Sequence, residues 1–529
     1  MAKVKGIVIT ENSTLRGTSP FYFLIRRVQL TFLIVFGLIN TTMFLNAAPV
    51  IHDTHDVKPL HPTYAGAADG QRYWGVAKNL IERGTFQYEY APGDLRPLQR
   101  GGPVPPLVYA GLMSLVDFDN APLLIVTLQC ALLYLVSLLS RNLAAPFLVN
   151  RDLVQGLILF NPSLIGLAHH AQSEILFLLF FTLLLSFCLK LLADEKHSHH
   201  IFLSIGISSG LLLLTRPAGL PFILMLPFAL FASVYFSHKK ISGATKTLVK
   251  QILPACLVAA LITTPWAMHN YQEYGKNGFT NGMVPVLYLN FLLLKSGSES
   301  TTNPNHKDQV LGNLIEQAIN KGLDPCCVTS HMSRVVDVSA PANKYQCGVT
   351  SPPKDCDKAL TSSYLAAMAT HPVGDWTRML LSAWISTYLG GGIYSISGYL
   401  GLQTPDRALI YAEYGRLDSY RSYFITAMSA FPGYFLLFLG ATGFAFIGRL
   451  AGVIGFATSI KNRPLLPYHF LYISPVIIFT ATYLFIGVSR FRAHLEPILA
   501  VYAAIGIVTC LHAIHAWLSE PSQKKEVKR

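Results

Sequence analysis

Acidic and basic side chains gather at the edges of long apolar runs, and these residues are the best suited to chemistry. Asp69 lies near the start of the stretch 68–84, and Glu174 opens an apolar run further along the chain. A carboxylate at a boundary between water and lipid can serve as a base, because its surroundings tune its proton affinity. Arginine binds phosphate oxygens through two parallel hydrogen bonds, so arginines near such acids favour a lipid phosphate as ligand.

We therefore expect these side chains to converge on one face of a membrane. The catalytic candidates are Asp69 and Glu174. The substrate-binding candidates are Arg72, Tyr73, Arg100, His170, Arg216, His269, Arg490 and Arg492. A purely structural explanation competes with this one. Negative charge stabilises the first turn of a helix, and arginines at the end of a span extend toward lipid head groups.

The stretch 68–84 has the spacing of an amphipathic helix. Tyr73, Val76, Ala77 and Leu80 fall three or four residues apart and share one helical face. Gly84 is a favourable residue to end such a helix. The pattern predicts a short helix that lies on the membrane surface, with Asp69 at its start.

The composition is that of a polytopic membrane protein. The 529 residues are 52% hydrophobic and 13% charged, with a mean hydropathy of +0.41, whereas soluble domains carry about 25% charged residues. The net charge of +13 reflects lysines and arginines in loops that are expected on the cytoplasmic side. It gives no support to nucleic-acid binding.

The apolar runs predict an all-α fold with about ten transmembrane helices, extracytoplasmic interfacial helices and one large extracytoplasmic loop. The expected spans are 30–50, 121–140, 153–167, 175–192, 201–214, 218–236, 252–266, 424–447, 468–488 and 495–516. Both termini are then cytoplasmic. The run 107–116 is too short to span and is expected to be interfacial.

This topology divides the chain into six parts. They are a cytoplasmic tail (1–29), a transmembrane catalytic core (30–268) with a first outer loop (51–120), an extracytoplasmic cysteine-containing loop (269–375), an interfacial or re-entrant segment (376–423), C-terminal transmembrane helices (424–517) and a cytoplasmic basic tail (518–529).

The cysteines fall into two groups. Cys130, Cys188, Cys256 and Cys510 lie in apolar runs and are interpreted as small core residues. The other four lie in the outer loop, where an oxidising compartment favours disulfides over a metal site, because paired C-x-x-C spacing is missing. These four are Cys326, Cys327, Cys347 and Cys356. A second metal hypothesis combines Glu174 with His169 and His170, but interfacial hydrogen bonding is the favoured explanation for these residues.

Six short motifs occur in order along the chain. They are Asp69-x-x-x-Tyr73, Arg100 followed by Pro105-Pro106-Leu107, Ser173-Glu174-Ile175-Leu176-Phe177, the run from Gly210 to Arg216-Pro217, Pro265-Trp266 with Asn270, and Arg490-Phe491-Arg492 with Pro497. Together they resemble the membrane-embedded GT-C glycosyltransferases. The resemblance is to the branch with protein mannosyltransferases and aminoarabinose–lipid A transferases, which is glycosyltransferase family 39-like.

The resemblance implies a sugar donor on a polyprenyl phosphate and a lipid, glycan or protein acceptor at the extracytoplasmic face. Asp69 would be the general base, the reaction would invert the anomeric carbon, and Glu174 would orient the acceptor or a metal. The leaving phosphate would be held by Arg100, Arg216, Arg490 and Arg492. The resemblance indicates no certain cofactor and allows a divalent metal. The expected location is a bacterial inner membrane with a periplasmic site.

Two features depart from the resemblance, and two other functions compete with it. Gly70 follows Asp69 where protein-mannosylating relatives often have a second acid, and the cysteine-containing loop is not part of the pattern. A transporter or polymerase of lipid-linked glycans would need polar residues in the middle of its spans, which are nearly absent here. A non-enzymatic scaffold would not need two acids together with outer arginines.

Overall fold

The computed structural model describes residues 68–91, 94–98, 101–118, 120–193, 199–238, 247–274, 369–392, 417–482 and 489–526, with a few isolated positions. Within these ranges, seven helical segments are long and apolar enough to cross a membrane. They are Ala121–Phe147, Glu174–Ala193, Pro217–Ser237, Val249–Gln272, Pro432–Ser459, Arg463–Thr482 and Arg490–Trp517. The chain is a polytopic membrane protein.

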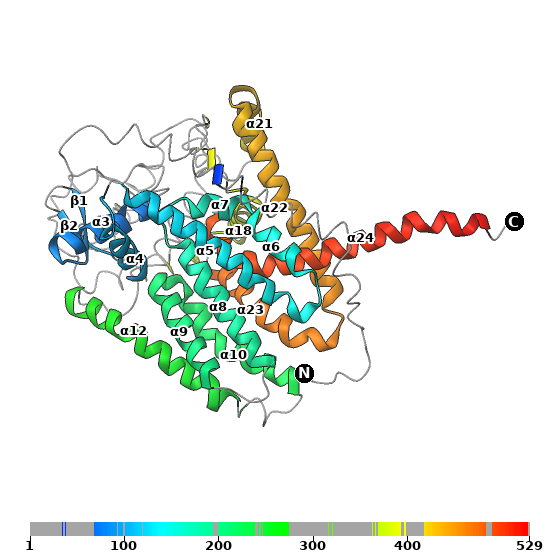
Figure 1. Cartoon of the computed structure of the whole chain (residues 1–529). Helices are drawn as coiled ribbons and strands as arrows, with labels where there is room; N and C mark the ends of the chain where they lie inside the picture. The colour runs from blue at the N-terminus through cyan, green and yellow to red at the C-terminus, as the bar shows by residue number, and fades with distance from the viewer. Residues whose placement is uncertain are drawn as a thin grey trace.

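The bundle surrounds α8 (Glu174–Ala193), which is apolar on every side and therefore buried on most of its surface. Figure 1 shows α8 among the neighbouring long helices. Its neighbours by contact include α5 (Ala121–Leu143), α9 (His199–Thr215) and α10 (Leu220–His238). α12 (Leu253–Tyr274) packs on α9, α23 (Leu466–Thr482) packs on α10, and α22 (Pro432–Ser459) packs on α24 (Glu496–Glu526).

Short 3-10 or π segments join several of these helices, and one of them carries site residues. The segment η7 (Ser489–Leu495) leads directly into α24. The remaining short segments are η3 (Ala145–Phe147), η4 (Pro217–Gly219), η5 (Leu248–Ile252) and η6 (Arg463–Leu465).

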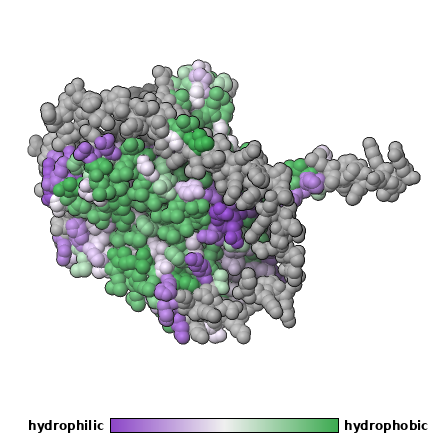
Figure 2. Space-filling view, in the orientation of Figure 1, coloured by the Kyte–Doolittle hydropathy of each residue, from purple (hydrophilic) through white to green (hydrophobic). Residues whose placement is uncertain are grey.

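The outer surface of the bundle is apolar. In Figure 2 a broad hydrophobic area covers the bundle on the side that faces the viewer. Leu257 and Leu261 of α12 and Leu224 and Phe228 of α10 are exposed. In water such a surface would be unfavourable, so these side chains are placed to face lipid.

The predicted helix 68–84 is present as α3 (Ala68–Arg83). Gly84 follows it with φ +66° and donates its N–H to the Leu80 carbonyl, so the glycine ends the helix in the left-handed conformation. The apolar face is buried within the protein, since Tyr73 and Val76 join a cluster with Tyr109 of α4 (Val104–Met113). The apolar face of α3 thus packs on the protein, and the expectation that the helix lies on the membrane surface stays a prediction.

A β-hairpin follows α3, and the all-α prediction missed it. β1 (Gln87–Ala91) and β2 (Asp94–Pro97) pair antiparallel, with Tyr88 opposite Arg96. The two strands are too short to show a clear alternation of apolar and polar residues, which is the signal that sequence reasoning uses for a strand.

Two predicted spans are each divided in two. The run 153–167 forms α6 (Arg151–Leu159) and α7 (Pro162–Ala168), because the Asn161 side chain accepts from the N–H groups of Ser163 and Leu164 and starts a new helix. The run that begins at 424 lies partly in α21 (Leu417–Ala430), which ends before Pro432 opens α22.

Ten spans are not confirmed, and two of the predicted elements remain open. The first span lies almost wholly outside the described residues. α9 has 17 residues, which is shorter than the ~20 residues of a typical transmembrane helix. α18 (Val373–Leu389) occupies part of the segment that was expected to be interfacial or re-entrant. It stops at Gly390–Gly392, where Gly392 has φ +66°. The predicted disulfide cysteines of the outer loop lie outside the described residues.

The end of α5 away from α3 holds a separate aromatic cluster. Phe147, His469, Tyr472 and Tyr502 lie within ring-contact distance of one another. The Tyr472 hydroxyl donates to the Leu143 carbonyl at 2.6 Å. This aromatic cluster lies at the end of the bundle opposite to Asp69 and Glu174.

Candidate functional site

The candidate site forms where four element ends meet. Asp69 lies in the first turn of α3, Glu174 opens α8, Arg216 follows the end of α9, and Arg490 lies in η7. Helix N-termini favour the two carboxylates, since the first N–H groups of a helix carry partial positive charge. The folded chain thus gathers residues that are as far apart in the sequence as Asp69 and Arg490.

Arg490 is positioned between the two acids. Its Nη2 donates to Asp69 Oδ2 at 3.1 Å, and its Nη1 lies 3.9 Å from Glu174 Oε1. Arg72 Nη1 donates to Asp69 Oδ1 at 3.3 Å, and Arg216 Nη1 donates to Glu174 Oε1 at 2.7 Å. Among the described residues, three guanidinium groups therefore face two carboxylates.

The ring of Phe491 supports two of these arginines. The guanidinium carbon of Arg216 lies 5.1 Å from the ring centroid, and that of Arg490 lies 5.0 Å from it. Both distances are within the range of a cation–π interaction. One aromatic ring therefore holds two like charges near each other beside the acids.

Among the residues that the structure describes, one buried oxygen of this cluster has no hydrogen-bond partner. Glu174 is 5% exposed, and its Oε2 is buried without a hydrogen-bond partner, while its Oε1 accepts from Arg216. A buried carboxylate oxygen without a donor costs about 1–3 kcal/mol or more. Such a cost is sustained where a ligand supplies the donor, so Oε2 is a candidate position for a ligand.

Tyr73 is buried next to the cluster. Its hydroxyl donates to Ser173 Oγ at 3.3 Å, and its ring is buried. Burial, followed by the nearby Asp69 charge, raises the pKa of Tyr73 to about 12. The side chain is therefore a neutral phenol that can donate or accept a hydrogen bond.

A network of hydrogen bonds fixes the turn before Glu174. Tyr109 donates to the Gln172 carbonyl at 2.7 Å, and Gln129 donates to the His170 carbonyl at 2.7 Å. His169 Nδ1 lies 2.7 Å from the Ile165 carbonyl, and burial lowers the pKa of His169. The backbone of His170 thus helps to place Glu174, and its ring is buried.

Glycines bring the first outer loop against the site. A Cβ atom on Gly101 would lie 2.4 Å from the Tyr73 ring, and one on Gly102 would lie 1.7 Å from the Leu214 carbonyl oxygen. Only glycine allows this approach. Arg100, which precedes this pair, lies outside the described residues.

Two of the predicted site residues are placed elsewhere. The Arg492 guanidinium is directed into a separate buried network with Glu496 and the end of α18, so it does not join Arg490. His269 stacks on Trp266 with a centroid distance of 5.2 Å and meets the edge of Phe86. Six predicted residues do lie around the cluster. They are Asp69, Arg72, Tyr73, Glu174, Arg216 and Arg490.

Sequence reasoning did not assign a role to Phe491, Ser173, Gly101 or Gly102. Phe491 had one available signal, because an aromatic residue between two arginines can stack on a guanidinium. The described residues contain no group of three or more His, Cys, Asp or Glu side chains that could hold a metal ion.

No protein-family model matches the chain, and no curated protein sequence matches it. Among solved structures, it is similar to the oligosaccharyltransferase AglB from Archaeoglobus fulgidus in complex with an inhibitory peptide and a dolichol-phosphate. The identity is 15%, the match covers 93% of this chain and 51% of AglB, and the TM-score is 0.44. For the Archaeoglobus fulgidus oligosaccharyltransferase tethered with an acceptor peptide, the identity is 14% and the TM-score is 0.47. The match covers 92% of this chain and 50% of that oligosaccharyltransferase chain.

ArnT from Cupriavidus metallidurans, bound to undecaprenyl phosphate, is also similar, with 13% identity over 90% of this chain and 77% of ArnT and a TM-score of 0.32. The chain spans about half the length of the two oligosaccharyltransferase chains. Both kinds of neighbour are GT-C glycosyltransferases, the class that the motifs resemble. All three TM-scores are below 0.5, so these similarities do not identify the function of this chain.

Proposed function

We propose that the chain is an integral membrane glycosyltransferase. It moves a sugar from a polyprenyl-phosphate-linked donor to a lipid, glycan or protein acceptor. The observation that carries this proposal is the pair of carboxylates, Asp69 and Glu174, that Arg490 joins. In this pair the buried Glu174 Oε2 has no hydrogen-bond donor among the described residues. A transporter or scaffold has no need for a buried acceptor oxygen beside two acids and three arginines.

The arginines suit the phosphate of the donor. Arg216 and Arg490 stack on one ring, so two guanidinium groups lie near each other and can bind phosphate oxygens. A phosphate that pairs with Arg490 would compete with Asp69 for the same guanidinium. Donor binding would then free an oxygen of Asp69 for the reaction.

Asp69 is the proposed general base. It takes the proton of an acceptor hydroxyl, and the acceptor oxygen forms a bond to the anomeric carbon of the sugar. The bond from that carbon to the phosphate oxygen breaks, and the polyprenyl phosphate leaves with the electron pair. A single displacement of this kind inverts the anomeric carbon, and the arginines stabilise the charge on the departing phosphate.

Glu174 is proposed to orient a substrate hydroxyl. Its Oε1 is held by Arg216, so Oε2 is fixed in direction and can accept a hydrogen bond from the sugar or the acceptor. The positive-inside rule favours a location of this end of the bundle outside the cytoplasm. We propose a bacterial inner membrane with the site at the periplasmic face.

The test is transfer from a labelled polyprenyl-phosphate sugar in proteoliposomes. We compare the wild type with Asp69→Asn, and we use Asp152→Asn as a matched control. Asp152 also pairs with an arginine, Arg141 at 3.0 Å, but at the opposite end of α5. We expect Asp69→Asn to lose transfer by about 10²- to 10⁴-fold while it still binds donor, and Asp152→Asn to stay active.

Equal transfer by the wild type and Asp69→Asn would remove Asp69 from the mechanism. If the wild type transfers no sugar from any of several donors but moves a lipid-linked glycan between leaflets, the protein is a transporter and the proposal is wrong.

A further inference from the structure

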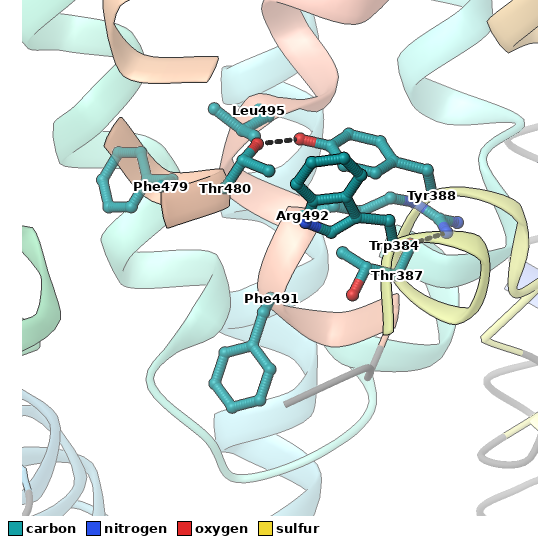
Figure 3. Close-up of a pocket in the computed structure, with 8 residues that line it drawn as sticks. All are labelled: Trp384, Thr387, Tyr388, Phe479, Thr480, Phe491, Arg492 and Leu495. Atoms are coloured by element: carbon teal, nitrogen blue, oxygen red, sulfur yellow. Dashed lines mark hydrogen bonds between the residues drawn. The ribbon is translucent and has the colours of Figure 1, made fainter. Parts of the chain in front are cut away.

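The segment η7 separates two arginines that are only two residues apart. Arg490 reaches the acids of the candidate site, and Arg492 is directed into the bundle. Figure 3 shows Arg492 close to Trp384, Thr387 and Tyr388 of α18, whereas the Phe491 ring points away from them. The sequence Arg490-Phe491-Arg492 therefore places successive side chains on different neighbours.

Arg492 is held by three acceptors. Its Nε donates to Glu496 Oε1 at 2.7 Å, and its Nη1 donates to the carbonyl oxygens of Thr387 and Gly390 at 2.6 Å each. The residue is 1% exposed. Its hydrogen bonds are thus directed at the protein, which makes it poorly suited to contact a lipid phosphate.

Arg449 of α22 completes this group. Its Nη2 donates to the same Glu496 Oε1 at 2.5 Å, and its Nε donates to the Tyr388 carbonyl at 3.4 Å. The last carbonyls of α18 therefore point at two guanidinium groups. The C-terminal end of a helix carries partial negative charge, so the two cations stabilise it together with Glu496.

We propose that Arg449, Glu496 and Arg492 form a positioning network for the donor-binding arginine, Arg490. The network ties η7 to α18, α22 and α24, so that Phe491 and Arg490 are presented to Arg216 and Asp69 in a fixed orientation. This inference rests on the proposed function, because it assigns Arg490 to the donor phosphate. It replaces the expectation that Arg492 contacts that phosphate directly.

The physical reason is the shape of η7. A 3-10 segment of seven residues has poor internal hydrogen-bond geometry and does not fix its own side chains. Arginine side chains lose rotamer entropy when they are ordered, so a site gains affinity if the protein fixes them beforehand. The hydrogen bonds of Arg492, two residues after Arg490, fix the backbone of η7 in this way.

The test is a double-mutant cycle read by binding of polyprenyl phosphate without sugar, in nanodiscs. The variants are Arg492→Lys, Arg490→Ala and the double variant. Lysine keeps the charge at position 492 but cannot reproduce the hydrogen bonds to Glu496 and to both carbonyls. Tyr472→Phe, alone and with Arg490→Ala, is the control for general loss of packing, since Tyr472 lies in the aromatic cluster at the opposite end of α5.

We expect Arg492→Lys to weaken binding about tenfold when Arg490 is present. In the Arg490→Ala background, the same change should have no further effect, because the group that it positions is gone. Tyr472→Phe should have the same small effect in both backgrounds. An equal tenfold loss from Arg492→Lys in both backgrounds would overturn the inference.

Glu496→Gln is the second variant and keeps an oxygen that can accept from both arginines. It should give the same dependence on Arg490, so the inference can still be contradicted if Arg492→Lys does not fold. If the wild type binds no polyprenyl phosphate and transfers no sugar, the proposed function itself is wrong. If it binds and transfers but the effects of positions 490 and 492 add independently, only the positioning inference is wrong.

Discussion

Two arginine–carboxylate groups share the segment η7, and they are built in opposite ways. The group around Asp69 is partly open: the Asp69 side chain is 30% exposed, and Glu174 Oε2 has no donor. The group around Glu496 is closed, since both arginines share its Oε1 and also bond to carbonyls at the end of α18. The same residue types therefore form an open group, which we propose as a binding site, and a closed group, which we propose as a structural connection.

The difference shows how to separate function from architecture in a membrane bundle. Removing a partner from a closed group leaves a buried charge without compensation, which reduces stability. Removing Asp69 from the open group should cost little stability, because its side chain is 30% exposed and water screens the charge on its arginine partners. Stability and activity should therefore respond to different residues, although those residues lie close together in the chain.

The largest effect is expected at Glu496. Glu496→Leu leaves Arg449 and Arg492 without their shared carboxylate and should reduce the free energy of unfolding by about 3–5 kcal/mol. Thermal unfolding in detergent measures this loss. Asp69→Asn is the matched variant in the open group and should unfold within a few degrees of the wild type. Equal midpoints for Glu496→Leu and Asp69→Asn would break the comparison.

The next effect concerns donor binding at Arg216. Arg216→Gln removes a guanidinium that pairs with Glu174 and stacks on Phe491, so polyprenyl phosphate should bind about 10- to 100-fold more weakly. Titration in nanodiscs gives the dissociation constants. Arg141→Gln removes an ion-paired arginine at the opposite end of α5 and should leave binding unchanged. Similar losses in both variants would show that binding follows net charge alone.

A smaller effect is expected at Tyr73. Tyr73→Phe removes the hydrogen bond to Ser173 and should cost about 1 kcal/mol of stability at neutral pH. Because the pKa of Tyr73 is raised from 10.0 to about 12, its contribution is complete below pH 10.0 and declines as the pH rises toward 12. Unfolding midpoints at neutral and alkaline pH should therefore converge for the wild type and Tyr73→Phe. A constant difference would contradict the shifted pKa.

The smallest effect concerns the turn that precedes Glu174. Burial lowers the pKa of His169 from 6.5, so the folded protein binds fewer protons than the unfolded chain below that pH. The contribution of His169 is complete above pH 6.5 and is lost as the pH falls, by at most about 1 kcal/mol over the first unit. Thermal midpoints of the wild type should fall more steeply with acid than those of His169→Gln. Parallel curves would remove this residue from the pH response.

Several elements could be predicted from local patterns. The spacing from Tyr73 to Leu80, followed by Gly84, gave the helix α3 with its end at Arg83. Its neighbours could not be predicted, because an amphipathic face does not show whether protein or lipid covers it. The break at Asn161 was missed for a related reason: hydropathy averages over a window, and one capping side chain does not change that average.

For the candidate site too, residue types could be predicted from local patterns, but contacts between residues could not. The types of its residues and their places at the ends of apolar runs pointed to Asp69, Glu174, Arg216 and Arg490. Arg492 was assigned with Arg490 because the two have the same type and almost the same position. Their separation depends on the carbonyls of α18, whose place beside η7 follows from packing.

The sequence by itself determined that the chain crosses a membrane and that acids and arginines lie at the boundaries of its apolar runs. Lipid imposes these features locally, since each spanning segment must be apolar and must satisfy its own backbone. Only the tertiary structure decided which arginine meets which carboxylate. Asp69 and Arg490 are 421 residues apart, and a contact over that separation depends on how the whole bundle packs, not on either local sequence.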